Sequence, residues 1–307
     1  MSKVAIITGA DGGMGQEHVK AVSKAGYEVV MACRNPQKAW PICKELIAKT
    51  HNTNIRVMKL DLASFASIYA FVEEIRQQFT HVDLLLNNAG RLCHQLEVTA
   101  DGVEMTVGVN YLGHYLLTRQ LLPLIPPGSR IVNMVSLTIR YGKVDHDIFT
   151  PVPAQKFNRF TAYSDSKLAL LYFTLDLAEE LKDKNILVNC ADPGIVSTNI
   201  IRQGNIVVDK MCDWFFRPII YKPAKGASTM IHLALSPDIT CTGKCFARKK
   251  HVLKFCLAEV AAKGRLRYDE LPARQDFDVE RCLTPCRTSS ILSAKGNSLL
   301  SSSTTKI

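Results

Sequence analysis

Tyr163 and Lys167 have the side-chain types and the spacing for acid–base chemistry. They lie four residues apart in the segment AYSDSKL (162–168), so on a helix both side chains occupy one face, with Cβ atoms about 6 Å apart. A phenol titrates near pH ~10, and a neighbouring ammonium group favours the phenolate and lowers that pKa. The pair alone leaves open a surface tyrosine and lysine without function. The sequence around the pair is needed to distinguish an acid–base pair from a surface pair without function.

The composition is that of a globular protein with a large core. The chain has 307 residues, of which 47% are hydrophobic and 21% charged, enough for one large α/β domain or two small ones. No apolar run reaches the ~20 residues of a membrane span. The sequence passes from Met1 directly into an expected strand, so we expect no signal peptide and a cytoplasmic location.

The ten cysteines fit a reducing compartment. Two CxxxC pairs, at 241/245 and 282/286, have a spacing that occurs at zinc sites. The first pair falls on the last expected strand and the second in the C-terminal tail. We therefore expect no shared metal site.

The net charge of +10 is concentrated toward the C-terminus. Residues 248–307 carry 12 Lys and Arg against 6 Asp and Glu, a net of +6. No aromatic residues interleave with these basic residues in a nucleic-acid-binding pattern, so we expect no nucleic-acid partner. The Ser-rich end of this extension favours disorder, and peripheral contact with a membrane surface is an alternative role for its basic residues.

Short apolar strands alternate with helical segments along the chain. We expect strands at 4–7, 28–33, 55–60, 82–86, 130–135, 186–190 and 244–246. We expect helices at 16–25, 35–49, 65–79, 107–122, 160–181 and 223–235. The strands are almost continuously apolar, as in parallel sheets covered on both faces. The alternation predicts an α/β protein over residues 1–247, with a single doubly wound parallel sheet (Rossmann fold) and helices on both faces.

A glycine-rich turn follows the first expected strand. Residues 8–15 read TGADGGMG and lead into a helical segment. Glycines at this place let the backbone approach a pyrophosphate, and the unpaired N–H groups of a helix N-terminus bind it. The turn therefore predicts a dinucleotide site.

The end of the second expected strand bears on the choice of dinucleotide. NAD sites place an acidic residue there for the ribose 2′-hydroxyl, whereas this sequence has Cys33 followed by Arg34, with Lys38 nearby. A cation without a carboxylate suits a 2′-phosphate, so the sequence favours NADP(H). Asp11 in the glycine-rich turn is an argument for NAD(H), which stays open as an alternative.

Polar residues recur where the expected strands end. Asp61 follows the third strand, NNAG (87–90) follows the fourth, and Ser136 follows the fifth. At its position Asp61 could accept a hydrogen bond from an adenine amino group. Open α/β sheets bind ligands at the carboxyl ends of their strands. We expect these residues to border one cleft, into which Asn110 could point from its helix.

With these parts in chain order, the sequence resembles a short-chain dehydrogenase/reductase. The resemblance covers residues 3 to about 247 and rests on TGADGGMG (8–15), NNAG (87–90), Asn110, Ser136, YSDSK (163–167) and DPGIVST (192–198). The segments ACRNPQKA, VNYLGHYLLT and AYSDSKLAL are most similar to the retinol-dehydrogenase-like branch, whose members often use NADP(H) on lipophilic alcohols and carbonyls. The 26 residues between Ser136 and Tyr163 also suit that branch.

The resemblance implies roles for four polar residues. Tyr163 would protonate the developing alkoxide during carbonyl reduction, or act as base in the reverse direction. Lys167 would lower the pKa of Tyr163 and bind the nicotinamide ribose. Ser136 would hold the substrate oxygen and stabilise its charge, and Asn110 would position a water that links Lys167 to solvent.

The resemblance also implies contacts along the whole cofactor. Glycines of the turn would hold the pyrophosphate, and Ile195 and Thr198 would bind the carboxamide. The full expected set is Gly9, Asp11, Gly13, Met14, Gly15, Arg34, Asp61, Leu62, Asn87, Ala89, Gly90, Tyr163, Lys167, Pro193, Gly194, Ile195 and Thr198. Two residues depart from the branch: Gly12 replaces a hydroxyl-bearing residue that commonly helps to hold the 2′-phosphate, and Asp192 replaces a histidine.

Two segments are expected to shape the substrate pocket. One is the loop 140–158, and the other is a lid at 196–222 centred on Trp214-Phe215-Phe216; a subunit interface and a bilayer contact are alternatives for the latter. A homodimer through the helices near 107–122 and 160–181 would follow from the resemblance. We expect an oxidoreductase that transfers hydride between NADP(H) and a lipophilic carbonyl or alcohol of retinoid, steroid or xenobiotic type. The alternative is a non-catalytic NADP(H) sensor or scaffold protein.

Overall fold

The structure is a computed structural model that describes residues 2–144, 148, 153–194 and 222–251. Three sequence expectations therefore lie outside the described residues. They are the cofactor contacts of Ile195 and Thr198, the lid up to residue 221, and the C-terminal extension beyond residue 251.

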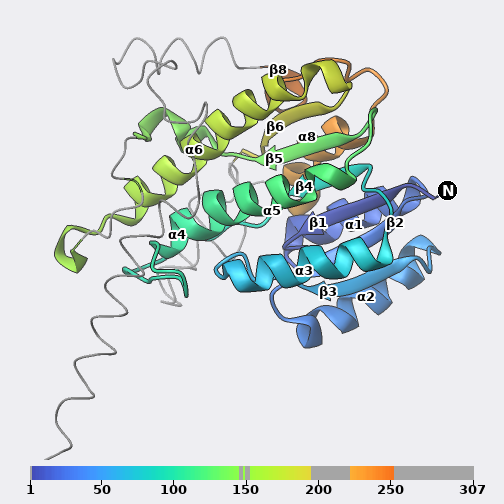
Figure 1. Cartoon of the computed structure of the whole chain (residues 1–307), viewed down its shortest axis with the longest axis horizontal. Coiled ribbons are helices and arrows are strands. Elements are labelled where there is room, and N and C mark those ends of the chain that lie inside the picture. Colours follow the sequence, from blue (N-terminus) through green and yellow to red (C-terminus); the bar gives the residue numbers. More distant parts are fainter. Residues whose placement is uncertain (1, 145–147, 149–152, 195–221, 252–307) are drawn as a thin grey trace, which may run out of the picture.

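A mixed sheet forms the centre of the described chain (Figure 1). Its strands are β1 (Val4–Thr8), β2 (Glu28–Cys33), β3 (Ile55–Lys59), β4 (Leu84–Asn87), β5 (Arg130–Met134), β6 (Leu187–Asp192), β7 (Cys245–Ala247) and β8 (Lys250–His251). They lie in the order β3-β2-β1-β4-β5-β6-β7-β8, parallel except for β8, which pairs antiparallel with β7. The doubly wound parallel sheet is confirmed, and β8 extends it past the boundary expected at residue 247.

Helices cover both faces of this sheet. One face carries α1 (Gly13–Lys24), α2 (Pro36–Thr50) and α8 (Pro223–Leu235), and the other carries α3 (Phe65–Gln78), α5 (Gly113–Leu121) and α6 (Arg159–Glu180). Successive residues of a strand point to opposite faces of the sheet. Ala5 and Ile7 therefore belong to the apolar cluster under α1, α2 and α8, and Val4 and Ile6 belong to the cluster under α3, α5 and α6. Within the described residues, no helix combines the length and the hydropathy required to cross a bilayer.

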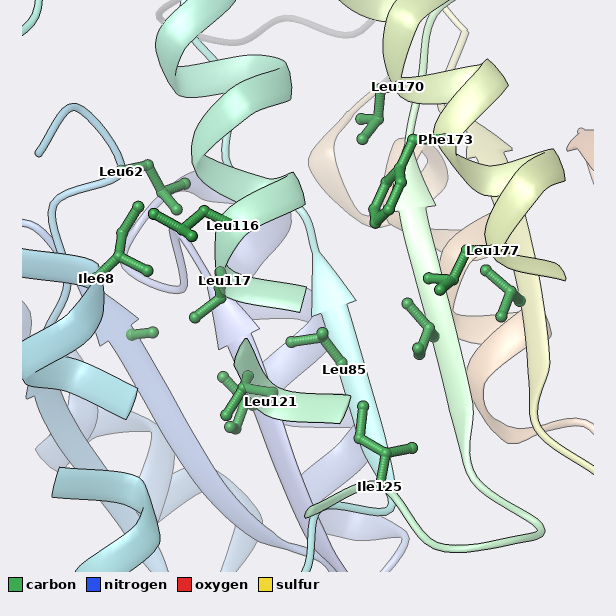
Figure 2. Close-up of a cluster of buried hydrophobic side chains, with 14 of the residues drawn as sticks. Leu62, Ile68, Leu85, Leu116, Leu117, Leu121, Ile125, Leu170, Phe173 and Leu177 are labelled. Atoms are coloured by element: carbon green, nitrogen blue, oxygen red, sulfur yellow. The ribbon is translucent and has the colours of Figure 1, made fainter. Parts of the chain in front are cut away.

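The cluster under α5 and α6 fixes these two helices on the sheet. Figure 2 shows Leu117 and Leu121 of α5 and Phe173 of α6 in this cluster, together with Leu85 of β4. Full burial of a leucine or phenylalanine side chain stabilises a fold by about 1.5–3 kcal/mol. The site residues carried by α5 and α6 therefore rest on a rigid support.

The helix expected at 107–122 is confirmed as an unbroken helical stretch, with a π turn inside it that was not expected. It consists of α4 (Met105–Val107), a π-helical segment η1 (Gly108–Leu112) and then α5. Two glycines of this stretch, Gly108 and Gly113, pack closely against their neighbours. A Cβ added to Gly108 would lie 2.5 Å from Thr99 Cγ2, and one added to Gly113 would lie 2.4 Å from the Leu62 carbonyl oxygen. Single π turns inside α-helices are frequent at functional sites, and Asn110 lies within this one.

Two further segments near the carboxyl edge differ from expectation. β6 was expected to end at residue 190 but continues to Asp192, which pairs with Ala247 of β7. A 3₁₀ helix, η3 (Leu137–Tyr141), directly follows Ser136, and a second, η5 (Ala154–Lys156), lies within the expected loop. The carboxyl edge therefore presents short structured segments directly after β5 and β6.

Candidate active site

The turn between β1 and α1 forms a cradle in which side chains do not fit. Gly9 has a φ of +60°, and a Cβ on Gly15 would lie 2.2 Å from the Gly9 oxygen and 2.8 Å from Ala10 Cα. Among the described residues, no side chain caps α1, and its first turn contains no acidic residue. The N–H groups at Gly13 and Met14 therefore remain for a phosphate at the positive end of the helix. These residues fit the pyrophosphate of a dinucleotide.

Thr8 and Asn88 support the cradle from below. The Asn88 side chain donates to the Thr8 carbonyl oxygen at 2.8 Å, and the Thr8 hydroxyl accepts from the backbone N–H groups of Asn88 and Ala89 at 2.9 and 3.0 Å. Asn87 is fully buried, and its side chain donates to Thr118 and Asn133. Much of the NNAG turn therefore supports the edge of the sheet, with Ala89 and Gly90 partly exposed beside it.

Both a cation and a carboxylate border the end of β2. Cys33 is buried, and Arg34 directly after it is exposed. Burial raises the pKa of the Cys33 thiol, and the neighbouring Asp11 carboxylate raises it further, which places Asp11 against this strand end. Asp61, after β3, accepts a hydrogen bond from the Ala63 N–H at 3.0 Å. Asp11, Arg34 and Asp61 thus lie near the ends of β2 and β3, and the Leu62 side chain packs in the core beside them.

Tyr163 and Lys167 share one face of α6, as the spacing predicts. The Lys167 Nζ lies 5.8 Å from the centroid of the Tyr163 ring and donates to the Met134 carbonyl oxygen at 2.8 Å. Lys167 is 2% exposed, and burial lowers its pKa to about 7. The ammonium group is therefore easily deprotonated and is held against the last residue of β5.

The pKa of Tyr163 is shifted in the direction opposite to the one expected. Burial, the largest cause, and the Asp192 carboxylate together raise this pKa to about 12, against a hydrogen bond with Ser136 that lowers it. The net shift is therefore upward, and the lowering expected from Lys167 stays a prediction. The cost of desolvating the phenolate dominates, and the Lys167 ammonium is itself desolvated and bound to the Met134 carbonyl oxygen.

Ser136 brings β5 and α6 together at the site. It follows β5 directly and caps η3, with its hydroxyl oxygen 3.3 Å from the Thr138 N–H that donates to it. The Ser136 side chain also acts on the Tyr163 phenol and lowers its pKa. The two groups expected to meet a substrate oxygen are therefore neighbours.

Asn110 joins the turn after β4 to α6. Its side-chain oxygen accepts from the Arg91 N–H at 2.7 Å, and its amide donates to the Arg91 carbonyl oxygen at 2.9 Å and to the Ser166 hydroxyl at 3.0 Å. Asn110 is fully buried. Its expected part in holding a water beside Lys167 stays a prediction.

His114 is a buried residue near the site that the sequence reasoning missed. Burial lowers its pKa to about 3, so the imidazole is neutral. Its Nδ1 lies 3.1 Å from the Asn110 carbonyl oxygen, so Nδ1–H donates there, and Nε2 accepts from the Thr8 hydroxyl at 3.0 Å. The signal available in the sequence was the spacing of four residues from Asn110 on an expected helix.

No group of three or more His, Cys, Asp or Glu in the described residues could hold a metal ion. Cys241 and Cys245 are free thiols. The second CxxxC pair, at 282/286, lies outside the described residues.

A phosphate cradle and a Ser–Tyr–Lys cluster at the carboxyl edge of a doubly wound sheet define a dinucleotide-dependent oxidoreductase. Residues 3–206 match the protein family described as short chain dehydrogenase, and the chain belongs to this short-chain dehydrogenase/reductase family. It is 36% identical to human retinol dehydrogenase 11 over 280 residues, which cover 90% of this chain and 84% of the relative. It is 37% identical to mouse retinol dehydrogenase 14 over 299 residues, with coverage of 92% and 85%.

Solved structures show the same fold. A variant of actinorhodin polyketide ketoreductase with NADPH has a TM-score of 0.63 and 25% identity, over 80% of this chain and 95% of that chain. RhlG of Pseudomonas aeruginosa with NADP has the same TM-score at 22% identity, over 80% and 94%. At family level the chain is an oxidoreductase that uses NAD(P)(H).

Proposed function

We propose that the protein reduces lipophilic carbonyl compounds with NADPH, or oxidises the corresponding alcohols with NADP⁺. The observation that carries this proposal is the placement of Tyr163 and the buried Lys167 on one face of α6, with Ser136 close enough to act on the Tyr163 phenol. A non-catalytic sensor has no need of such a cluster.

The residues of the cradle fit a dinucleotide. Gly9, Gly13 and Gly15 would hold its pyrophosphate, and Arg34 would pair with a 2′-phosphate, which supports NADP(H) over NAD(H). Pro193 and Gly194 follow β6 and begin the segment expected at the carboxamide. When bound, the nicotinamide supplies or accepts the hydride.

The protein side chains then manage the proton and the charge on the substrate oxygen. Ser136 donates a hydrogen bond to that oxygen, and the Tyr163 phenol gives up its proton as the alkoxide develops. A pKa raised to about 12 keeps Tyr163 protonated at neutral pH, which is the state that reduction requires. Lys167, with a pKa near 7, stabilises the resulting phenolate and returns a proton to it.

The substrate class that we propose is a retinoid, a steroid or a xenobiotic carbonyl. The names of the relatives, retinol dehydrogenases 11 and 14, support the retinoid. We also propose a cytoplasmic protein, with homodimerisation and peripheral membrane contact as associations to be tested by gel filtration and by cell fractionation.

The test is NADPH consumption, with NADH in parallel, against retinal, a steroid ketone and an aromatic aldehyde. We expect turnover that prefers NADPH and is lost in Tyr163→Phe. Tight NADPH binding without turnover on any of these, or on the alcohols in the reverse direction, would favour the sensor alternative. Equal use of NADH would overturn the role of Arg34 and leave the reaction class intact.

The basic extension can be tested separately for membrane contact. Because β8 ends at His251, truncation should follow that residue so that the sheet stays whole. An electrostatic contact predicts binding to anionic liposomes that weakens with salt and with truncation. Equal liposome binding by the full and truncated chains would remove this role.

A further inference from the structure

His114 lies in the middle of a chain of hydrogen bonds that joins two parts of the site. It is fully buried near the start of α5. Its Nε2 lies 3.0 Å from the Thr8 hydroxyl at the end of β1, and its Nδ1 lies 3.1 Å from the Asn110 carbonyl oxygen in the π turn. The imidazole therefore bridges the strand that leads into the cradle and the turn that carries Asn110.

The hydrogen bonds of Thr8 fix the protonation state of this imidazole. A threonine hydroxyl has one proton and two lone pairs. Both lone pairs accept, from the backbone N–H groups of Asn88 and Ala89 at 2.9 and 3.0 Å. Because a third donor would have no lone pair to meet, Nε2 of His114 must accept the hydroxyl proton. The remaining hydrogen of the ring lies on Nδ1, which donates it to the Asn110 carbonyl oxygen.

Burial and the nearby charge favour the same neutral form. Desolvation is the largest cause that lowers the pKa of His114 to about 3, and the Lys167 ammonium group also lowers it. Charged Lys167 repels a proton from the imidazole, and neutral Lys167 leaves burial to act alone. The Leu86 carbonyl oxygen also lies near the Thr8 hydroxyl, but at 3.4 Å it is a poorer acceptor than Nε2. His114 thus presents one donor and one acceptor at neutral pH.

The chain of bonds continues from Thr8 into the cradle. The hydroxyl that donates to His114 also holds the turn after β4. In that turn the Asn88 side chain donates to the Thr8 and Gly9 carbonyl oxygens at 2.8 and 3.3 Å. A Cβ on Gly9 would lie 3.0 Å from Ala89 Cα. A shift of Gly9 therefore displaces the turn that the Thr8 hydroxyl holds.

The chain of bonds continues from Asn110 into α6. The Asn110 carbonyl oxygen accepts from His114, and the Asn110 amide donates to the Ser166 hydroxyl at 3.0 Å. Ser166 in turn donates to the Tyr163 carbonyl oxygen at 2.7 Å. Asn110, His114 and Ser166 are fully buried, so bulk water does not compete for these bonds. They connect the cradle with the part of α6 that carries Tyr163.

We propose that His114 is a positioning residue that couples the cofactor cradle to the placement of Tyr163. This inference rests on the proposed function. A dinucleotide bound at Gly9 fixes the turn after β4, and the bonds through Thr8 and His114 then fix the π turn and α6. By linkage, whatever holds α6 in place also favours binding of the dinucleotide.

Two substitutions of His114 cut the chain at opposite ends. In His114→Asn, an amide at the position of Nδ1 can still donate to the Asn110 carbonyl oxygen, and the bond to Thr8 is lost. In His114→Gln, an amide at the position of Nε2 can still accept from Thr8, and the bond to Asn110 is lost. We expect each variant to raise the Kd for NADPH and to lower kcat, both by about three- to tenfold, because either cut breaks the coupling.

Independent local bonds predict a different pattern. His114→Asn would then raise the Kd alone, and His114→Gln would lower kcat alone. A merely structural role predicts a lower melting temperature with wild-type kcat and Kd. Either pattern would overturn the proposal. His232→Asn and His232→Gln make the same changes in the last turn of α8, on the opposite face of the sheet, and we expect neither quantity to change there.

Nitrogen NMR of histidine-labelled protein tests the inference without turnover and without altering His114. Among the described residues, His18 and His114 are the fully buried histidines, and His18→Phe distinguishes them. We expect His114 to keep Nδ1–H and an unprotonated Nε2 from pH ~6 to ~8, and saturating NADPH to shift the Nε2 signal. A titrating ring or an unmoved signal would overturn the inference. Absent turnover with a shifted signal would contradict the proposed function alone.

Discussion

Gly142 packs on Ser164 so closely that an added Cβ would lie 2.6 Å from the Ser164 carbonyl oxygen and 2.9 Å from its carbonyl carbon. Gly142 ends η3, and Ser164 directly follows Tyr163 on α6. The next residue, Lys143, donates its N–H to the Asp165 carboxylate at 2.6 Å. The contact between η3 and α6 therefore sets the distance between the Ser136 hydroxyl and the phenol.

Gly142→Ala should separate the Ser136 and Tyr163 hydroxyls, for which we propose catalytic roles. The new Cβ meets backbone, so η3 must shift, and overpacking of this kind costs about 1–3 kcal/mol. We expect kcat to fall by about tenfold or more with little change in the Kd for NADPH, because β4 separates β1, which leads into the cradle, from β5, which leads into η3. Steady-state kinetics and fluorescence titration of NADPH measure the two quantities. Unchanged kcat would show that the close contact has no bearing on the site.

Tyr163→Phe should remove turnover and leave cofactor binding within a few-fold. Loss of a positioned acid typically costs about 10²–10⁴ in rate. Tyr172→Phe is the matched control on the same helix, since the Tyr172 hydroxyl is buried without a hydrogen-bond partner among the described residues. We expect near-normal kcat in that variant. Equal losses in both variants would assign Tyr163 a structural role.

Arg34→Ala and Asp11→Asn should act on opposite cofactors. Arg34 follows β2, where we propose that it pairs with a 2′-phosphate, so its removal should weaken NADPH binding about tenfold or more and leave NADH nearly unchanged. Asp11 offers the only acceptor of the two for a 2′-hydroxyl, and its neutralisation should weaken NADH more than NADPH. Lys24→Ala, at the far end of α1, is the control. A uniform effect of Arg34→Ala on both cofactors would contradict its assignment.

The stability of the wild type should depend on pH through Asp192. Its pKa is about 6 when folded against 3.8 for the ordinary carboxyl group, so the folded state binds more protons between these values. The stability that protonation provides is complete below pH 3.8 and is lost as pH rises through 6. Relative to Asp192→Asn, the wild type should lose about 2 kcal/mol between pH ~4 and ~7. Urea denaturation of both proteins at the two pH values measures this difference, and parallel curves would contradict it.

The alternation of apolar strands and helices was sufficient to predict the sheet, and the strand ends were sufficient to bring Ser136, Tyr163 and Lys167 to one edge. The π turn at Asn110 leaves no periodic signal in the sequence, and the bonds from Asn110 to Arg91 join residues 19 positions apart. The upward shift of the Tyr163 pKa was not predictable for a similar reason. Spacing along α6 shows its neighbour Lys167, but burial and the charge at the end of β6 come from the folded chain. β8, with two residues, is too short to leave a periodic signal.

The buried amides beneath the site also constrain how the chain can assemble. Asn87 of β4 donates to Thr118 of α5 at 2.9 Å and to Asn133 of β5 at 2.7 Å, and Asn133 donates to Thr174 of α6 at 2.9 Å. Apolar clusters tolerate a helix displaced by a turn, since one leucine can replace another. The four polar side chains do not tolerate such a displacement, because each polar group left unpaired in the interior costs about 1–3 kcal/mol. The chain of bonds thus acts as a register check during folding, which rejects compact states in which α5 or α6 has docked one turn out of place.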